Sequence, residues 1–391
     1  MRLKILHLFS DWKWTGPAEP VVALCKALTD RGHHVVLAYQ KPPDPEREGL
    51  ASRVAEKGIR WTDRFYLDHS LKPGHPSSVS RSLLDLWRLK RFLREERFDI
   101  VCVHLSHDHV LGGLAARGSR VETVVIRTDH QRDPLKPSLG NRMLLRWLTD
   151  GLITFSERAR REDSDHFRFS AERVCKAPPA LDLERFNPHR PLKDMRAHFG
   201  VAADEVVIGM VARFQRYRRT EVFLEAFQSI VREFPKTKLL LIGRSSQMEE
   251  SVIKPIKRLG IAPWVVLGGY QTDHYVDTLA CMDIFVFLMA GSDGTARALR
   301  EAMAMGKPAI VADRGMLPEL VEEGVSGFVV KDSPDDLARA SLELLRNPEL
   351  RWRMGRAAYE RAQREFRLER QVEVVEAFYE RMVQLGRRRS S

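Results

Sequence analysis

Short apolar runs that alternate with amphipathic stretches constrain the fold of this chain more than any other feature. The run Leu3–Phe9 is followed by the helical pattern Pro20–Arg31 and then by the run His34–Tyr39. The alternation continues through Ser80–Glu96, Ile100–Leu105, Val121–Arg127 and Gly151–Phe155. Strands that alternate with helices in this way are typical of parallel sheets joined by crossover helices. The first half is therefore predicted to form a doubly wound α/β sheet.

A proline-rich segment, Ala177–Pro191, interrupts this pattern, which then restarts at Val206–Val211. The predicted strands that follow are Lys238–Ile242, Val265–Leu267, Ile284–Leu288, Pro308–Val311 and Phe328–Val330. The predicted helices are Glu221–Glu233, Asp335–Arg346, Pro348–Phe366 and Glu369–Leu385. A chain of 391 residues also exceeds one ordinary core. We therefore expect a first domain over residues 1–185, a linker over 186–200, a second domain over 201–366 and a C-terminal helix with a basic tail over 367–391.

Composition narrows the class of protein. Hydrophobic residues make up 43% and charged residues 30%, which is a soluble globular balance, and no apolar run approaches the roughly 20 residues of a membrane span. Four widely spaced cysteines lie in or beside apolar runs, so we expect buried, reduced thiols, no metal and a cytoplasmic location. Of the net charge of +11, residues 1–190 carry most, with 33 Lys and Arg against 25 Asp and Glu. This excess suits an anionic lipid or a phosphorylated acceptor, and we expect no nucleic-acid partner.

The segment Gly291–Glu301 follows a predicted strand and enters a helix through small residues. Free backbone N–H groups at such a helix start form an anion site, here over Gly294, Thr295, Ala296 and Arg297. The carboxylates of Asp293 and Glu301 can accept hydrogen bonds from sugar hydroxyls. The alternative is that Asp293 only caps the helix and Glu301 is a surface charge.

A cationic loop, Gly209–Thr220, directly follows the first strand of the second half. It holds four arginines within seven residues, among them Arg213 and Arg218. A guanidinium binds phosphate oxygens through a planar fork and stays charged, so the expected ligand is a diphosphate. The alternative is a solvated basic loop.

Two loops of the first half are further candidates. Gly16 lies in the turn before the first predicted helix, where a small residue allows the backbone to approach a ligand. The alternative is an ordinary turn before a helix, with Thr15 as a candidate cap. His130 follows the strand Val121–Arg127 and is either a ligand contact or structural. The histidines of the loop after Ile100–Leu105 are interpreted as acceptor-side or structural residues, since they lack the spacing of a fourth metal ligand: His104, His107 and His109.

These motifs resemble those of retaining glycosyltransferases of the GT-B fold, family 4 (glycosyl transferases group 1). Asp293 and Glu301 are similar to that family's E-x7-E pair, and Glu301–Pro308 resembles its E-A-M-A-x-G-x-P segment. The segments Gly315–Val321 and Gly324–Val330 resemble G-G-x-P-E-x-V and G-x-x-G-x-L-V. The resemblance implies that Asp293 contacts the transferred sugar and Glu301 the donor ribose.

Other positions match the family less closely. Arg213 matches the Arg of G-R-L-x-x-x-K-G, whereas Arg218 stands in place of Lys and Arg219 in place of Gly. Gly16 matches the first loop of the family, and His130 stands where the family has a histidine that touches the donor sugar. The resemblance also implies a last helix that packs back on the first domain, front-face transfer in which the leaving phosphate receives the acceptor's proton, and no metal or cofactor.

We therefore expect a glycosyltransferase that moves a hexose-type sugar from a nucleotide-diphosphate sugar to a glycan or lipid-linked acceptor, in cell-envelope glycan or lipopolysaccharide synthesis. A nucleotide-sugar epimerase of the same fold and a non-catalytic nucleotide-sugar-binding partner are the alternatives. Kinase, dehydrogenase and hydrolase signatures are absent from the sequence. The basic amphipathic stretches Ser80–Arg97 and Arg142–Leu148 lead us to expect peripheral association with the inner face of an anionic membrane.

Overall fold

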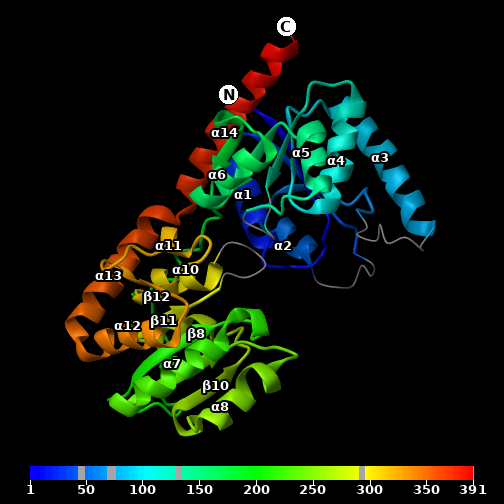
Figure 1. The fold of residues 1–391 in the computed structure, drawn as a ribbon. Helices are drawn as coiled ribbons and strands as arrows, with labels where there is room; N and C mark the ends of the chain where they lie inside the picture. Colours follow the sequence, from blue (N-terminus) through cyan, green and yellow to red (C-terminus); the bar gives the residue numbers. More distant parts are fainter. Residues whose placement is uncertain (43–48, 68–75, 129, 131–133, 290–295, 391) are drawn as a thin grey trace. The chain divides into compact units, whose positions relative to one another are not determined.

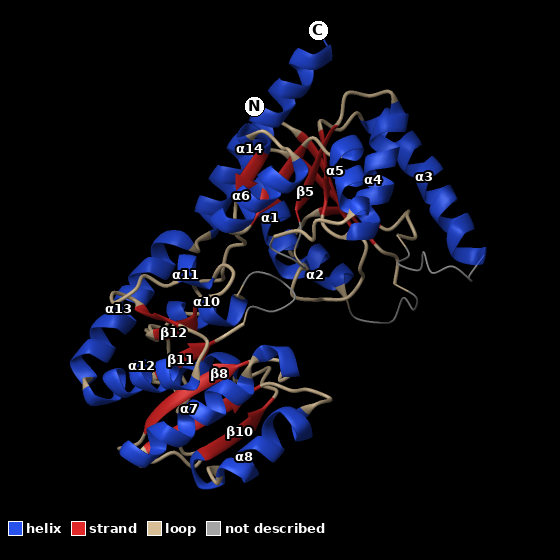
Figure 2. Cartoon of the chain, in the orientation of Figure 1, coloured by secondary structure: helices blue, strands red, loops and turns tan. Residues whose placement is uncertain are grey.

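The computed structural model describes residues 1–42, 49–67, 76–128, 130, 134–289 and 296–390. The chain forms two α/β units (Figures 1 and 2). The first unit comprises Met1–Ala180 and Leu368–Ser391, and the second is built from the residues between them. Each unit contains one sheet whose strand pairs are all parallel. The predicted pair of doubly wound, Rossmann-like domains is therefore confirmed.

The sheet of the first unit has the strand order β3-β2-β1-β4-β5-β6-β7. Its strands are β1 (Lys4–Phe9), β2 (His34–Tyr39), β3 (Arg60–Thr62), β4 (Ile100–Val103), β5 (Val124–Thr128), β6 (Gly151–Thr154) and β7 (Val174–Lys176). The order reverses between β1 and β4. Ligands of open α/β sheets bind at such a point.

Helices cover both faces of this sheet: α1 (Ala18–Asp30), α2 (Leu50–Glu56), α3 (Pro76–Glu96), α4 (Ser106–Ser119), α5 (Leu139–Leu148), α6 (Glu157–Phe167) and α14 (Leu368–Ser390). The alternation of side chains along β4 determines which helix meets which face. Val101 and Val103 lie under Gly112 of α4, where an added Cβ would clash with Val103 and contact Val101. Cys102 points the other way, and its Sγ lies 2.9 Å from the hydroxyl of Tyr379 on α14. The C-terminal helix is thus part of the first unit's core.

The sheet of the second unit has the order β10-β9-β8-β11-β12-β13. Its strands are β8 (Val206–Val211), β9 (Thr237–Ile242), β10 (Val265–Gly269), β11 (Ile284–Phe287), β12 (Ala309–Ala312) and β13 (Gly327–Val330). Its helices are α7 (Thr220–Glu233), α8 (Lys254–Leu259), α9 (Tyr275–Ala280), α10 (Arg297–Ala304), α11 (Leu317–Leu320), α12 (Pro334–Arg346) and α13 (Pro348–Glu365). Here the order reverses between β8 and β11. Residues 181–200 belong to this unit, in which Phe186, Met195 and Phe199 are buried.

Some local predictions differ from the structure. The strand predicted over Val121–Arg127 begins only at Val124, because the Val121 N–H bonds the hydroxyl of Ser119 instead of a neighbouring strand. All four cysteines are free and buried, as expected. Within the described ranges, no helix is long and apolar enough to cross a bilayer.

Candidate active site

The second unit brings its two candidate motifs together at the reversal between β8 and β11. The cationic loop follows β8, and the segment that leads to α10 follows β11. Because β8 and β11 pair in parallel, both segments leave the same edge of the sheet. Arg218 joins them directly, since its Nη1 donates a 3.1 Å hydrogen bond to the carbonyl oxygen of Met289. The proximity of the two motifs is therefore a property of the fold.

Arg218 is a buried cation. The residue ends a single 3-10 turn, Arg216–Arg218, and is only 8% exposed. The guanidinium lies 5.1 Å from the centre of the Tyr217 ring, and its Nε has no hydrogen-bond partner. Among the described residues, none forms an ion pair with it. A buried charge without a counterion is costly, so this guanidinium is suited to hold an anion.

The start of α7 adds to this anion site. Thr220 opens a helix of 14 residues, is fully buried, and its Oγ1 also has no hydrogen-bond partner. No side chain caps this helix start, which leaves its N–H groups and the positive end of its dipole available. Arg213, two residues after β8, is exposed and forms no ion pair with any residue in the part of the chain that the structure describes. Arg213, Arg218 and the start of α7 therefore supply positive charge at one strand end.

Arg219 shows why glycine suits this turn. Its backbone lies in the left-handed region, with φ of 62°, which costs a residue with a side chain about 1–2 kcal/mol. Its Nε donates to Oδ2 of Asp332 at 2.9 Å, and Arg314 contacts the same oxygen. Arg219 is thus directed toward Asp332, whereas Arg218 remains without a carboxylate partner among the described residues.

The second motif enters α10. Asp293, Gly294 and Thr295 lie outside the described residues, so the structure does not test their predicted roles. The helix begins at Arg297, and Ala296 at its N-cap has a left-handed φ of 47°. No side chain caps α10, because alanine carries no acceptor. Glu301 is the fifth residue of this helix, one turn from its start.

Glu301 is a buried carboxylate, at 3% exposure, and not a surface charge. Its Oε1 accepts a hydrogen bond from Nε of Arg297 at 2.7 Å, and its Oε2 accepts one from the hydroxyl of Tyr275 at 2.6 Å. Burial, followed by the neighbouring carboxylate, raises the pKa of Tyr275 well above its usual value, so the phenol keeps its proton and donates it. These two hydrogen bonds hold Glu301 in place, and a carboxylate is an acceptor that can bind hydroxyl groups.

Sequence reasoning missed Tyr275. It opens α9, and its ring packs edge-on against Phe186 with centroids 6.1 Å apart. No sequence pattern signals its bond to Glu301, because 26 residues separate the two.

In the first unit, Gly16 lies in an exposed turn before α1. The alternative in which Thr15 caps this helix is wrong: α1 begins at Ala18 after Pro17, and Thr15 contributes only its carbonyl oxygen, which accepts the Ala18 N–H at 3.0 Å. An added Cβ at Gly16 would meet no atom within 4 Å. The turn therefore leaves space for a ligand, although the described residues alone do not demand glycine there.

His130 is buried at the carboxyl end of β5 and is joined to two other histidines. Its Nε2 lies 3.2 Å from Nδ1 of His104, and Nε2 of His104 lies 2.9 Å from Nδ1 of His7. His104 follows β4 and His7 lies within β1, so this histidine chain crosses the point where the strand order reverses. His7 escaped sequence analysis because it lies inside an apolar strand.

His107 and His109 were expected in a loop, but both lie on α4. Asp108 explains why the helix starts there, since its carboxylate accepts the N–H groups of Leu105 at 2.6 Å and His104 at 3.2 Å. Burial raises the pKa of Asp108 to about 7. His109 bonds Thr149 at 2.6 Å and is structural. No cluster of metal-ligating side chains occurs among the described residues.

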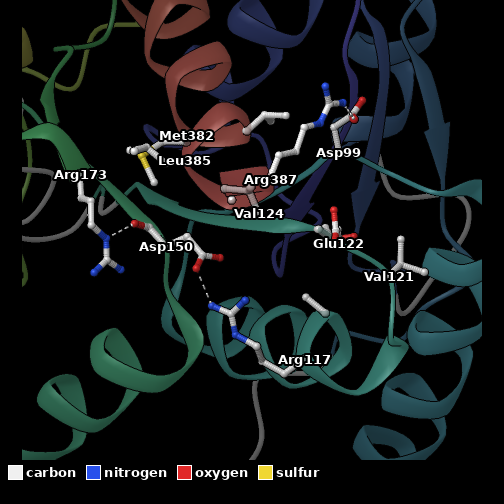
Figure 3. A pocket seen from close by; sticks show the side chains of 14 residues that line it. Asp99, Arg117, Val121, Glu122, Val124, Asp150, Arg173, Met382, Leu385 and Arg387 are labelled. Atoms are coloured by element: carbon white, nitrogen blue, oxygen red, sulfur yellow. Dashed lines mark hydrogen bonds and ion pairs between the residues drawn. The ribbon is translucent and has the colours of Figure 1, made fainter. Parts of the chain in front are cut away.

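A hollow of about 380 Å³ lies at the opposite, amino edge of the first sheet (Figure 3). Its arginines are already occupied: Arg117 donates to the carboxylate of Asp150 at 2.9 Å, and Arg173 donates to the backbone oxygen of the same residue at 2.6 Å (Figure 3). Arg387 lies 3.6 Å from Asp99. With these cations paired, the hollow is a poorer anion site than the edge that carries Arg218.

Comparison with known families identifies both halves of the chain. The family Glycosyltransferase Family 4 matches residues 15–185, and the family Glycosyl transferases group 1 matches residues 193–361. The resemblance to GT-B glycosyltransferases of family 4 and group 1 is thus confirmed.

The chain is 25% identical over 300 residues to N-acetyl-alpha-D-glucosaminyl L-malate synthase of Bacillus anthracis, covering 75% of this chain and 77% of that protein. It spans less than two thirds of the length of several other curated relatives. Among solved structures, it resembles Anabaena Alr3699/HepE in complex with UDP, with a TM-score of 0.77, 19% identity, and coverage of 96% of this chain and 99% of that one. It also resembles the lipopolysaccharide outer core galactosyltransferase WaaB, with a TM-score of 0.73, 14% identity, and coverage of 96% and 99%.

Proposed function

Because this chain consists of a family 4 and a group 1 glycosyltransferase domain in the GT-B fold, it is a glycosyltransferase, and we propose that its donor is a nucleoside diphosphate sugar. The observation that carries this proposal is Arg218, a buried guanidinium that has no counterion among the described residues and is tied to both motif loops. A diphosphate supplies the missing anion. HepE, which shares the fold, has been solved with UDP and with UDP-glucose, so UDP is the first nucleotide to test.

The chemistry follows from the groups at this strand edge. Arg213, Arg218 and the uncapped start of α10 neutralise the charge that develops on the departing diphosphate, which weakens its bond to the sugar. Glu301, held by Tyr275 and Arg297, accepts hydroxyls of the donor ribose. His130, with Asp293 as the expected second contact, orients the transferred sugar. We propose that transfer retains the anomeric configuration, with the leaving phosphate receiving the acceptor's proton, and that it needs no metal or cofactor.

Titration calorimetry with UDP, GDP and ADP tests the donor site, and product NMR after incubation with the matching sugar nucleotides tests transfer and retention. We expect one nucleoside diphosphate to bind, and we expect binding to weaken in Arg213→Ala and Glu301→Ala. Interconversion of nucleotide sugars without an acceptor would favour an epimerase instead, a reaction named for one protein of similar fold. Donor binding without hydrolysis, transfer or interconversion would favour a non-catalytic partner.

We also propose that the acceptor is lipid-linked and that the first unit binds an anionic membrane at the cytoplasmic face. Two rows of exposed apolar side chains repeat every four residues, one on α3 and one on α5, the two helices on either side of α4 (Figure 1). The row on α3 is Val79, Leu83 and Trp87, and the row on α5 is Leu139, Met143 and Trp147, all between 53% and 75% exposed. Large exposed apolar patches mark sites of interaction with proteins or membranes.

Basic side chains accompany both rows. The guanidinium of Arg91 lies 5.9 Å from the ring centre of Trp87, and that of Arg146 lies 5.5 Å from that of Trp147. Tryptophan flanked by arginine fits the interface of a bilayer that contains acidic lipids. WaaB, which has a similar fold, is a lipopolysaccharide outer core galactosyltransferase. Envelope glycans are therefore the first class of acceptor to test.

Vesicle flotation tests this surface. The wild-type protein is expected to float with phosphatidylglycerol vesicles and less with pure phosphatidylcholine, and the double variant Trp87→Ala, Trp147→Ala is expected to lose most of this binding. The matched control is Trp352→Ala, which removes an equally exposed tryptophan, also beside an arginine, from the second unit. Equal flotation of the double variant and the control would exclude the two helices as the membrane contact.

A further inference from the structure

Asp332 is the shared partner of two arginines in the second unit. Its Oδ2 accepts a hydrogen bond from Nε of Arg219 at 2.9 Å and lies 2.6 Å from Nη2 of Arg314. The side chain of Asp332 is only 9% exposed, whereas those of the two arginines are 36% and 44% exposed. Its other oxygen, Oδ1, is buried and has no hydrogen-bond partner among the described residues. The bonding of this buried carboxylate is thus directed at the two guanidinium groups.

The ion pair joins the cationic loop to a distant strand of the same sheet. Arg219 belongs to the loop after β8, and Asp332 lies two residues after the end of β13. In the order of the sheet, β11 and β12 lie between these two strands. The carboxylate therefore holds the loop from a part of the unit that its own strand does not contact.

The backbone of Arg219 needs such support. Its φ of 62° and ψ of 28° lie in the left-handed region, which is unfavourable for a residue with a Cβ. Its N–H closes the 3-10 turn with a long hydrogen bond of 3.4 Å to the carbonyl oxygen of Arg216. Arg218 ends this same turn, so the conformation of the next residue affects where the Arg218 guanidinium lies.

We propose that Asp332 is a positioning residue for Arg218: by binding Arg219, it holds the left-handed turn that presents the Arg218 guanidinium to a diphosphate. The identity of the anion rests on the proposed function, but the position of Arg218 in the free protein does not. Without the ion pair the strain is no longer offset, and only the molecules that keep the left-handed turn bind the anion. Arg219→Gly makes the ion pair unnecessary, because glycine adopts this backbone conformation readily.

The sign of the effect separates positioning from electrostatics. Asp332 carries a negative charge close to a site for an anion. A purely electrostatic role therefore predicts that Asp332→Ala binds a diphosphate as well as the wild type or more tightly. A purely stabilising role predicts a lower melting temperature with unchanged affinity. Positioning predicts weaker binding, and it predicts that Arg219→Gly restores it.

Titration calorimetry measures these differences, with the nucleoside diphosphate that the wild type binds among UDP, GDP and ADP. Scanning fluorimetry ensures that each variant is folded at the temperature used. We expect Kd to rise about 5- to 30-fold in Arg219→Ala and in Asp332→Ala, with no further rise when the two are combined. Arg219→Gly, alone or with Asp332→Ala, should stay within about threefold of the wild type.

The matched control is Glu221→Ala. It removes another carboxylate from the neighbourhood of Arg219, but one that is 38% exposed and 3.7 Å from Nη1, so Kd should change less than about threefold. Unchanged or tighter binding by Asp332→Ala would overturn the proposal. So would a loss in Arg219→Gly as large as that in Arg219→Ala, because the Arg219 guanidinium would then bind the anion itself.

Proton–nitrogen NMR correlation of the arginine Nε–H groups tests the position of Arg218 without a nucleotide, and loss of a signal in Arg218→Met assigns it. Because Nε of Arg218 is buried, we expect its proton to exchange slowly with water. Exchange should become about 5- to 30-fold faster in Asp332→Ala and return to the wild-type rate when Arg219→Gly is added. An unchanged rate in Asp332→Ala would overturn the proposal. If the wild type binds no nucleoside diphosphate, the proposed function fails, while the exchange rates still decide whether Asp332 positions Arg218.

Discussion

Replacing Arg218 by methionine separates the stability of this protein from its binding of a diphosphate. In the free protein, the change removes one hydrogen bond to the Met289 carbonyl and one cation–π contact with Tyr217. Together these contribute about 2–4 kcal/mol. The change also removes a guanidinium that is 8% exposed and has no counterion among the described residues, and burying such a charge costs several kcal/mol. The two effects are of similar size and opposite sign.

We therefore expect the melting temperature of free Arg218→Met to stay within about 3 °C of the wild type, since 1 kcal/mol shifts a unit of this size by about 2–4 °C. The bound state differs, because the lost hydrogen bonds join two charged groups and contribute about 1.5–3 kcal/mol. The affinity for UDP, or for whichever nucleoside diphosphate binds, should fall by about 10- to 150-fold.

Differential scanning fluorimetry of the free protein and titration calorimetry with the nucleotide measure the two quantities. The matched control is Arg216→Met, which changes an exposed arginine of the same turn and is expected to alter affinity less than about threefold. Affinity that is unchanged in Arg218→Met would refute the assignment of the anion site. So would a large loss of stability in the free variant, because the guanidinium would then be satisfied by the protein itself.

Three other predictions concern stability. Tyr275→Phe removes the buried hydrogen bond to Glu301 and should lower the free energy of unfolding by about 1.5–3 kcal/mol in thermal denaturation; a loss below about 0.5 kcal/mol would mean that the bond is not formed. Ala296→Gly relieves a left-handed φ and should raise the free energy of unfolding in urea by up to about 1 kcal/mol, so a clear decrease would contradict the backbone argument. His7 takes up a proton below about pH 6.5 when unfolded, but only near pH 3 when folded. Stability should therefore rise with pH between these values, by up to about 1.4 kcal/mol per unit, and His7→Leu should make this slope shallower; equal slopes would contradict the burial argument.

The fold was predictable because strand and helix patterns alternate along the chain and each short apolar run has only one simple way to be buried. No local sequence pattern predicts the strand order inside each sheet, and this order places β8 beside β11. Arg218 could be proposed from its position after a strand, but its burial could not, because its neighbour Arg216 in the same turn has the same side chain and is exposed.

The residues that escaped prediction act through contacts that are distant in sequence. Tyr275 opens a short helix and His7 lies in an apolar strand, and neither position suggests a polar partner until the sheets are assembled. The supposed cap at Thr15 failed for the opposite reason, since a suitable residue type was present but the helix began three residues later. Local sequence patterns thus predicted the candidate loops but not the hydrogen bonds between residues that are distant in sequence.

The helix α14 has a consequence for how the molecule is made. It supplies Phe378 and Tyr379, which are fully buried in the first unit, yet it follows the whole second unit in the chain. Residues 1–180 therefore leave the ribosome with one apolar face exposed. That face can be buried only after the residues of α14, which begin at Leu368, have been synthesised. A chain truncated after residue 367 should therefore contain a folded second unit and a first unit that binds chaperones through its exposed apolar face.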